Sequence, residues 1–107
     1  MRGLVISVQM INWDLVVSLF QKAKSLENQK QAGNDAFRSN DFAKASELYT
    51  EALSIDSLNK LTNSKLYCNR ALVNSKLKKY DECVNDCTEA IELDPTYIKA
   101  YLRRAKW

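Results

Sequence analysis

Apolar residues recur at intervals of three and four over most of the chain, and this spacing predicts helices. Between residues 42 and 55 the apolar positions include 42, 45, 48, 49, 52, 53 and 55. Two further runs of this kind occupy 64–95, separated by the polar pair Lys78-Lys79 and closed by Asp94-Pro95. Proline cannot continue a helix interior, so the last of these helices is expected to end there. The pattern therefore predicts helical hairpins.

The two stretches are copies of one unit. A single offset places apolar on apolar and acid on acid at eight positions: Phe42 on Tyr80, Ala45 on Cys83, Tyr49 on Cys87, Glu51 on Glu89, Ala52 on Ala90, Leu53 on Ile91, Ile55 on Leu93 and Asp56 on Asp94. Such coincidence at one offset indicates an internal repeat. We expect a first unit at 26–59, a connection at 60–63, a second unit at 64–97 and a partial third unit at 98–107.

Residues 1–20 differ from the rest, because most positions from Leu4 to Phe20 are apolar. Gln9, Asn12 and Asp14 interrupt this run, and no small-x-small cleavage site follows it. The run is also too short and too polar to span a bilayer. We predict an N-terminal extension over 1–25, in which a helix covers the first repeat with the stripe Ile11, Leu15 and Leu19. An unstructured start of the chain is the alternative.

Composition narrows the classes of function. The chain has 107 residues, 46% apolar and 27% charged, with two Gly and one Pro, which favours one small all-α domain. The net charge of +3 is dispersed and contains no run of five like charges, so nucleic acid is not an expected partner. The absence of histidine removes the commonest general base and metal ligand. No glycine-rich phosphate loop is present, and we expect no enzyme activity and no cofactor.

The cysteines and the acidic residues of the last predicted helix have structural explanations. Cys68, Cys83 and Cys87 are odd in number, and Cys83-x3-Cys87 lies on the apolar face of its helix. Buried, reduced thiols are therefore favoured over a metal or redox pair, which indicates a reducing compartment, the cytosol or nucleus. The acidic residues fit helix caps and solvated faces: Asp81, Glu82, Asp86, Glu89 and Glu92.

The repeat resembles the tetratricopeptide repeat, a helix-turn-helix unit of about 34 residues. The resemblance is carried by a small residue in each first helix (Gly33, Ala71, Ala105), by Ala45-x3-Tyr49 and Cys83-x3-Cys87, by Ala52 and Ala90, and by Pro95. Ser57 at the first closing-proline position, and Gln29 and Tyr67 at the early tryptophan position, depart from the family pattern. The resemblance implies a right-handed α-superhelix whose concave wall is formed by the first helix of each pair.

The segments KQAGN, LYCNR and IKAYLRRA are similar to the carboxylate-clamp subset of this family. In that subset five residues bind the acidic C-terminal peptide of heat-shock chaperones of the 70 and 90 kDa classes. Carried over to this chain, the five are Lys30, Asn34, Asn69, Lys99 and Arg103. Phe37, Leu72 and Lys76 lie a turn further along and are either secondary peptide contacts or helix packing. The resemblance implies an adaptor protein. We expect a monomer, although the residues leave the oligomeric state open.

The runs LYCNRALVNSKL and DPTYIKAYLRRA look like the second repeat cluster of the DnaJ-type cochaperones that combine such repeats with a J domain. The His-Pro-Asp signature of a J domain is impossible here without histidine, so we expect a fragment or a short relative. The alternative function is a generic repeat scaffold that self-associates through the apolar segment from Leu4 to Phe20. Its distinguishing feature is that apolar segment rather than the five polar residues.

Overall fold

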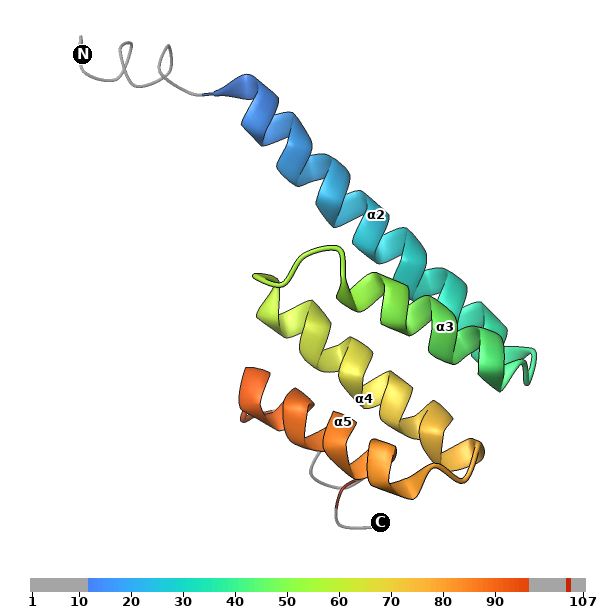
Figure 1. The fold of residues 1–107 in the computed structure, drawn as a ribbon. Coiled ribbons are helices and arrows are strands. Elements are labelled where there is room, and N and C mark those ends of the chain that lie inside the picture. The colour runs from blue at the N-terminus through green and yellow to red at the C-terminus, as the bar shows by residue number, and fades with distance from the viewer. Residues whose placement is uncertain (1–11, 97–103, 105–107) are drawn as a thin grey trace, which may run out of the picture.

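The computed structural model describes residues 12–96 and Arg104, and its fold is a stack of antiparallel helices (Figure 1). The helices are α2 (Trp13–Arg38), α3 (Phe42–Leu53), α4 (Lys60–Lys76) and α5 (Tyr80–Leu93). Each packs against its neighbour in the chain, α2 on α3, α3 on α4 and α4 on α5. Within 12–96 there is no strand. The prediction of an all-α fold built from helical hairpins is confirmed.

The two hairpin turns have the same geometry. Asn40 and Lys78 occupy corresponding positions of the two repeat units, and they are the two non-glycine residues of the described chain with positive φ, at 61° and 62°. A residue in this left-handed conformation commonly ends a helix and reverses the chain. After the first turn, the Asp41 carboxylate accepts a hydrogen bond from the Lys44 amide at 3.2 Å, as expected of an N-cap.

Helix α2 is longer than expected. It runs unbroken for 26 residues through the boundary that we expected after residue 25. Leu15 and Leu19 are 55% and 54% exposed, so they do not cover the first repeat, and Ile11 lies outside the described residues. Helix α2 starts early because Asn12 caps it by accepting a hydrogen bond from the Leu15 amide, and no Pro or Gly interrupts residues 13–32. Because α3 has only 12 residues, it is too short to cover the whole of α2. The N-terminal part of α2 therefore projects beyond the stack (Figure 1).

The expected connection at 60–63 is helical instead. The Asn59 side chain accepts a hydrogen bond from the Thr62 amide at 3.3 Å, so α4 begins at Lys60. Asn63 is buried and donates through Nδ2 to the backbone oxygen of Asp56 at 2.7 Å. The offset between the two units exceeds the length of one repeat, and the additional residues extend α4 by a turn at its start.

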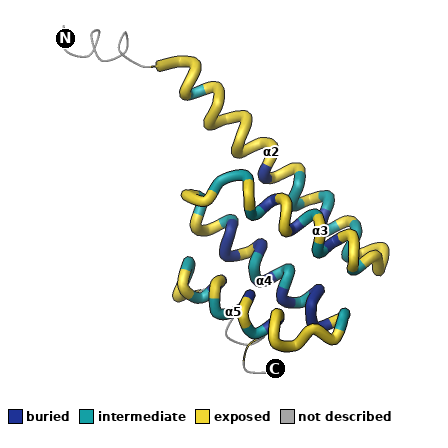
Figure 2. The backbone as a smooth tube through the Cα atoms, viewed as in Figure 1, coloured by how far each residue is buried: buried dark blue, intermediate teal, exposed yellow. Residues whose placement is uncertain are grey.

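The core follows the stack, and α4 is buried on both sides because it lies between α3 and α5 (Figure 2). One cluster joins α2, α3 and α4: Leu26, Ala45, Tyr49, Ala52, Leu66 and Val73. Two smaller clusters join α4 to α5, one of Cys68 and Ala90 and one of Ala71, Cys83 and Cys87. The three cysteines are buried, as predicted for Cys83 and Cys87. No group of three potential metal ligands occurs among residues 12–96 and 104.

In each hairpin a small residue on the first helix packs against a side chain of the second helix that occupies the space between them. A Cβ placed on Gly33 would lie 2.6 Å and 2.7 Å from Cε1 and Cδ1 of Tyr49, so the ring occupies the space above the glycine. At the corresponding positions of the second unit, Ala71 packs with Cys87. Where Ala71 replaces the smaller glycine, Cys87 replaces the larger tyrosine, so the helices of each hairpin stay closely packed.

No helix of the described chain is long and apolar enough to cross a membrane.

Gly33→Ala is expected to destabilise the fold. The added methyl would overlap the ring of Tyr49, which is 2% exposed and enclosed by the core, and such overpacking costs about 1–3 kcal/mol. The higher helix propensity of alanine offsets up to about 1 kcal/mol. Urea unfolding followed by circular dichroism measures the free energy of unfolding of both proteins.

The matched control is Gly33→Ala in a Tyr49→Cys background, which copies the Ala71 and Cys87 pairing of the second hairpin. There the alanine is expected to be neutral or stabilising, because no ring opposes it. The same free-energy change in both backgrounds would contradict the steric explanation.

Candidate functional site

Three of the five predicted clamp residues lie in the described chain. Lys30 and Asn34 are one turn apart on α2, and Asn69 is on α4. The two amides lie against each other across the helices, since Asn69 Nδ2 is 3.4 Å from Asn34 Oδ1. The other two residues, Lys99 and Arg103, lie outside the described residues.

A cavity of about 170 Å³ opens beside these amides. Its lining consists of residues from α2, α3 and α4: Asn34, Phe37, Arg38, Tyr49, Asn69 and Leu72. Phe37 and Leu72, the predicted secondary contacts, thus share one hollow with the two amides, whereas Lys76 is exposed and is not part of the lining. Arg38 and Tyr49 were not among the predicted site residues.

Tyr49 orients the amide of Asn34. Its hydroxyl donates a hydrogen bond to Asn34 Oδ1 at 2.6 Å, while its ring is buried. That oxygen also faces Asn69 Nδ2, so two donors point at it. The NH₂ group of Asn34 has no hydrogen-bond partner within residues 12–96, and it is the part of the amide left for a ligand. The Ala45-x3-Tyr49 spacing indicated only packing for this tyrosine, because its hydroxyl meets α2 through the tertiary fold.

Lys30 is held loosely. Its ammonium lies 3.3 Å from Glu27 Oε2, with the lysine side chain 19% exposed and the glutamate 62% exposed. An ion pair with such an exposed partner contributes about 0–1 kcal/mol. Most of the Lys30 side chain is covered, which keeps the charge close to the helix surface. An incoming anion can therefore replace Glu27 at little cost.

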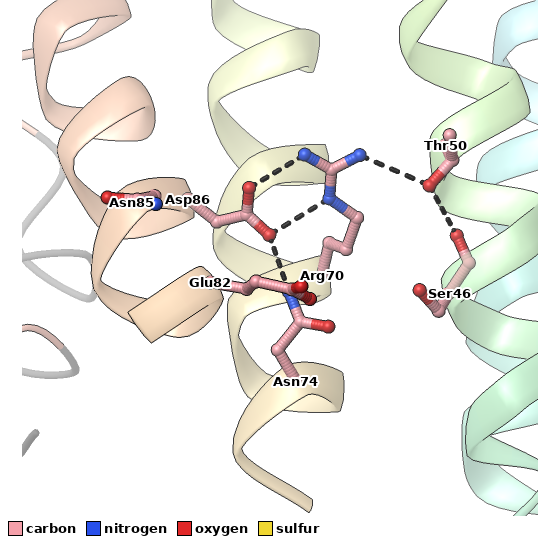
Figure 3. A pocket seen from close by; sticks show the side chains of 7 residues that line it. All are labelled: Ser46, Thr50, Arg70, Asn74, Glu82, Asn85 and Asp86. Carbon is pink, nitrogen blue, oxygen red and sulfur yellow. Dashed lines mark hydrogen bonds and ion pairs between the residues drawn. The ribbon is translucent and has the colours of Figure 1, made fainter. Parts of the chain in front are cut away.

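A larger cavity of about 360 Å³ lies between α3, α4 and α5 (Figure 3). Its centre is a bidentate ion pair in which Arg70 donates through Nε and Nη2 to Asp86 at 2.9 Å and 2.7 Å. Arg70 Nη1 also donates to Thr50 Oγ1 at 3.1 Å, and Asn74 Nδ2 donates to Asp86 Oδ2 at 2.9 Å. The network links three helices, and Figure 3 shows these side chains directed toward one another.

This network is structural in character. The hydrogen bond and charge of Asp86 raise the pKa of Arg70 above its usual value, against the opposing effect of burial, so the guanidinium stays charged. Asp86 is only 5% exposed, and its expected assignment to a cap or solvated face is wrong. The acidic pattern of α5 locates Asp86 on a helix face, but it contains no information that Arg70 of α4 covers that face. Arg70 and Asp86 neutralise each other, and their hydrogen bonds to each other, Thr50 and Asn74 leave few donors or acceptors for a ligand.

The stacked helical hairpins define the class of protein as a helical repeat. The family described as Tetratricopeptide repeat matches residues 64–97. The chain is also 58% identical over 86 residues to the human protein "DnaJ homolog subfamily C member 7", a match that covers 80% of this chain and 17% of that protein. The chain thus spans about a sixth of the length of the curated relatives it matches first.

Solved structures of similar chains belong to the same family. The second TPR of Spaghetti (RPAP3) bound to the HSP90 peptide SRMEEVD has 34% identity and a TM-score of 0.71, covering 80% of this chain and 78% of that one. The second TPR domain of human RPAP3 in complex with the HSP70 peptide SGPTIEEVD has 36% identity and a TM-score of 0.70, covering 78% and 66%. The chain belongs to the tetratricopeptide repeat family. It is a protein-interaction module similar to the repeat domains of cochaperones.

Asp86→Ala is expected to destabilise the fold by about 3 kcal/mol, because it leaves the half-buried guanidinium of Arg70 without its carboxylate. Thermal and urea unfolding measure the loss. Glu82→Ala is the matched control, since Glu82 lines the same cavity one turn away on α5 but is exposed, and its loss should change stability by at most about 0.5 kcal/mol. Equal effects of the two substitutions would contradict the assigned role of the pair.

Tyr49→Phe tests the orientation of Asn34. The ring and its packing over Gly33 remain, and loss of the hydroxyl is expected to cost about 1 kcal/mol of stability. The side-chain amide resonances of Asn34 should shift and broaden in heteronuclear NMR spectra, because one of two donors to its oxygen is removed. Unchanged Asn34 side-chain resonances would show that the tyrosine does not hold this amide.

Proposed function

We propose that this chain is a cochaperone-like adaptor that binds the acidic C-terminal peptide of heat-shock chaperones of the 70 and 90 kDa classes. The residues that bind the terminal carboxylates are Lys30, Asn34, Asn69, Lys99 and Arg103. Phe37 and Leu72 contact the peptide upstream of its last residue, and the exposed Lys76 can reach acidic residues further along. The interaction is non-catalytic and takes place in the cytosol or nucleus.

The observation that carries this proposal is the meeting of the Asn34 and Asn69 amides beside a hollow lined by Phe37 and Leu72. The two amides can donate hydrogen bonds to a carboxylate, and the nearby Lys30 ammonium can pair with its charge. The hollow beside them can take an apolar side chain. A peptide that ends in Val-Asp offers both groups. Similar domains have been solved with peptides that end in Glu-Glu-Val-Asp. The proposal transfers that ligand to this chain on the basis of matching residue types.

The energetics favour weak, reversible binding. Each charge-assisted hydrogen bond contributes on the order of 1.5–3 kcal/mol. A few of them with some apolar contact give about −8 kcal/mol, which corresponds to roughly micromolar affinity. Because the binding residues are partly exposed, added salt should weaken the interaction. Asn34 and Asn69 add donors without adding charge, which limits nonspecific attraction of other anions.

Isothermal titration with a peptide ending in Glu-Glu-Val-Asp, and with its C-terminally amidated twin, tests the proposal. The free-carboxylate peptide is expected to bind at least about tenfold more tightly, because amidation removes the terminal negative charge that the clamp residues would contact. Asn69→Ala and Arg103→Ala should abolish this difference between the two peptides. Equal affinity of both peptides for the unmodified chain would sink the clamp assignment.

A second set of variants separates the clamp from general charge effects. Lys30→Ala is expected to weaken the free-carboxylate peptide by about tenfold. Lys24→Ala, which removes an exposed lysine of the same helix almost two turns earlier, is the matched control and should leave affinity within about twofold. If both lysines matter equally, binding depends on net charge rather than on a defined site.

A further inference from the structure

Arg38 lines the cavity beside Asn34 and Asn69, and the proposed clamp gives it no role. It lies in the last turn of α2, one turn after Asn34, and its side chain is 68% exposed. Among the described residues that line this cavity, it is the only one that carries a charge. The hollow therefore offers a cation next to the apolar side chains of Phe37 and Leu72.

Most hydrogen-bond donors of Arg38 are unused. Its Nη1 donates to Asp35 Oδ1 at 3.0 Å, and within residues 12–96 and 104 neither Nε nor Nη2 has a hydrogen-bond partner. Arg70 is the contrasting case, because its Nε and Nη2 both donate to Asp86 while its Nη1 donates to Thr50. The edge of the guanidinium with which Arg70 binds a carboxylate of the fold is thus still available on Arg38 for a carboxylate of a ligand.

The ion pair between Arg38 and Asp35 is easily exchanged. The two side chains are 68% and 64% exposed, and a pair this exposed contributes little to stability. Asp35 Oδ1 also accepts a hydrogen bond from Gln31 Nε2 at 3.3 Å, so Asp35 keeps a partner when Arg38 turns away. Asp35 is not part of the cavity lining. A carboxylate that enters the cavity therefore competes with Asp35 for one guanidinium.

The direction of the cavity indicates which part of a peptide reaches Arg38. Phe37 follows Asn34 by three positions and Leu72 follows Asn69 by three, so the hollow extends from the two amides toward the C-terminal ends of α2 and α4. Arg38 lies four positions after Asn34, which is about 6 Å along the helix axis. An extended peptide advances by about 3.3 Å per residue, so this separation corresponds to two peptide residues.

We propose that Arg38 is a specificity-determining residue that binds the acidic side chain two places before the terminal residue of the peptide. Asp35 is its internal competitor and lowers the affinity for such peptides. The inference rests on the proposed function, since it takes the terminal carboxylate to be bound at Asn34 and Asn69. It adds a requirement for a particular upstream acid to the requirement for a free terminus.

Isothermal titration of the full chain with peptides ending in Glu-Glu-Val-Asp, Glu-Gln-Val-Asp and Gln-Glu-Val-Asp tests the role of Arg38. Loss of the glutamate next to valine is expected to weaken binding about fivefold. In Arg38→Gln this loss should have no effect, whereas loss of the other glutamate should affect both proteins equally. Lys44→Gln is the matched control, because it removes the same charge from an exposed residue of α3 outside the lining and should preserve the fivefold difference.

Asp35→Asn tests the competitor. It should tighten binding of the Glu-Glu-Val-Asp peptide by about twofold to threefold and leave the Glu-Gln-Val-Asp peptide unchanged, because only the first peptide uses Arg38. The gain should disappear when Arg38→Gln is added. Glu47→Gln makes the same change in charge at an exposed position of α3 and should alter neither peptide. Circular dichroism checks that every variant remains helical.

The outcomes separate this inference from the proposed function. Equal losses for the Glu-Gln-Val-Asp peptide in the unmodified chain and in Arg38→Gln would overturn the role of Arg38, even where the free-carboxylate peptide still binds more tightly than its amidated twin. A gain in Asp35→Asn that does not depend on the glutamate next to valine would overturn the role of Asp35. Equal binding of the free and amidated peptides would overturn the clamp and, with it, this inference.

Discussion

The ring of Tyr49 above Gly33 is the contact on which the rest of the structure depends. It fills the space between the helices of the first hairpin, and its burial holds α3 against α2. The same side chain ends in a hydroxyl that reaches Asn34. One residue therefore sets both the separation of two helices and the direction of a polar group in the candidate site.

The second hairpin solves the same packing problem without polar chemistry. Ala71 and Cys87 replace the glycine and the tyrosine, and the position that corresponds to Asn34 is Leu72. No hydroxyl is therefore needed there, and none is present. Polar cohesion comes instead from Arg70, which joins α4 to both α3 and α5 through Thr50 and Asp86. The two repeats share a backbone but differ in their polar contacts, because Tyr49 of the first donates to Asn34, whereas Arg70 and Asp86 of the second form an ion pair.

Much of the fold follows from the sequence because it depends on periodic, local signals. The repeat offset and the cap at Asp41 report short-range preferences, and the helices and turns form where those preferences agree. The full length of α2 was not predicted, because no Pro or Gly marks the boundary that we expected. In the candidate site, Asn34 and Asn69 were predicted from the resemblance to the carboxylate-clamp subset, whereas the hydroxyl of Tyr49 and the burial of Asp86 were missed. Helical period fixes a face, but which neighbouring helix covers that face is a property of the stack.

The position of the cavity has a mechanical consequence. Each helix packs against its chain neighbours, so a stack of this kind opens most readily at a junction between hairpins. Asn34 and Asn69 belong to different hairpins, and the cavity beside them bridges α2, α3 and α4. Any ligand held by both amides acts as a splint across that joint. Occupancy would slow hydrogen exchange at the α3–α4 boundary, because separation of the two hairpins would first require release of the ligand.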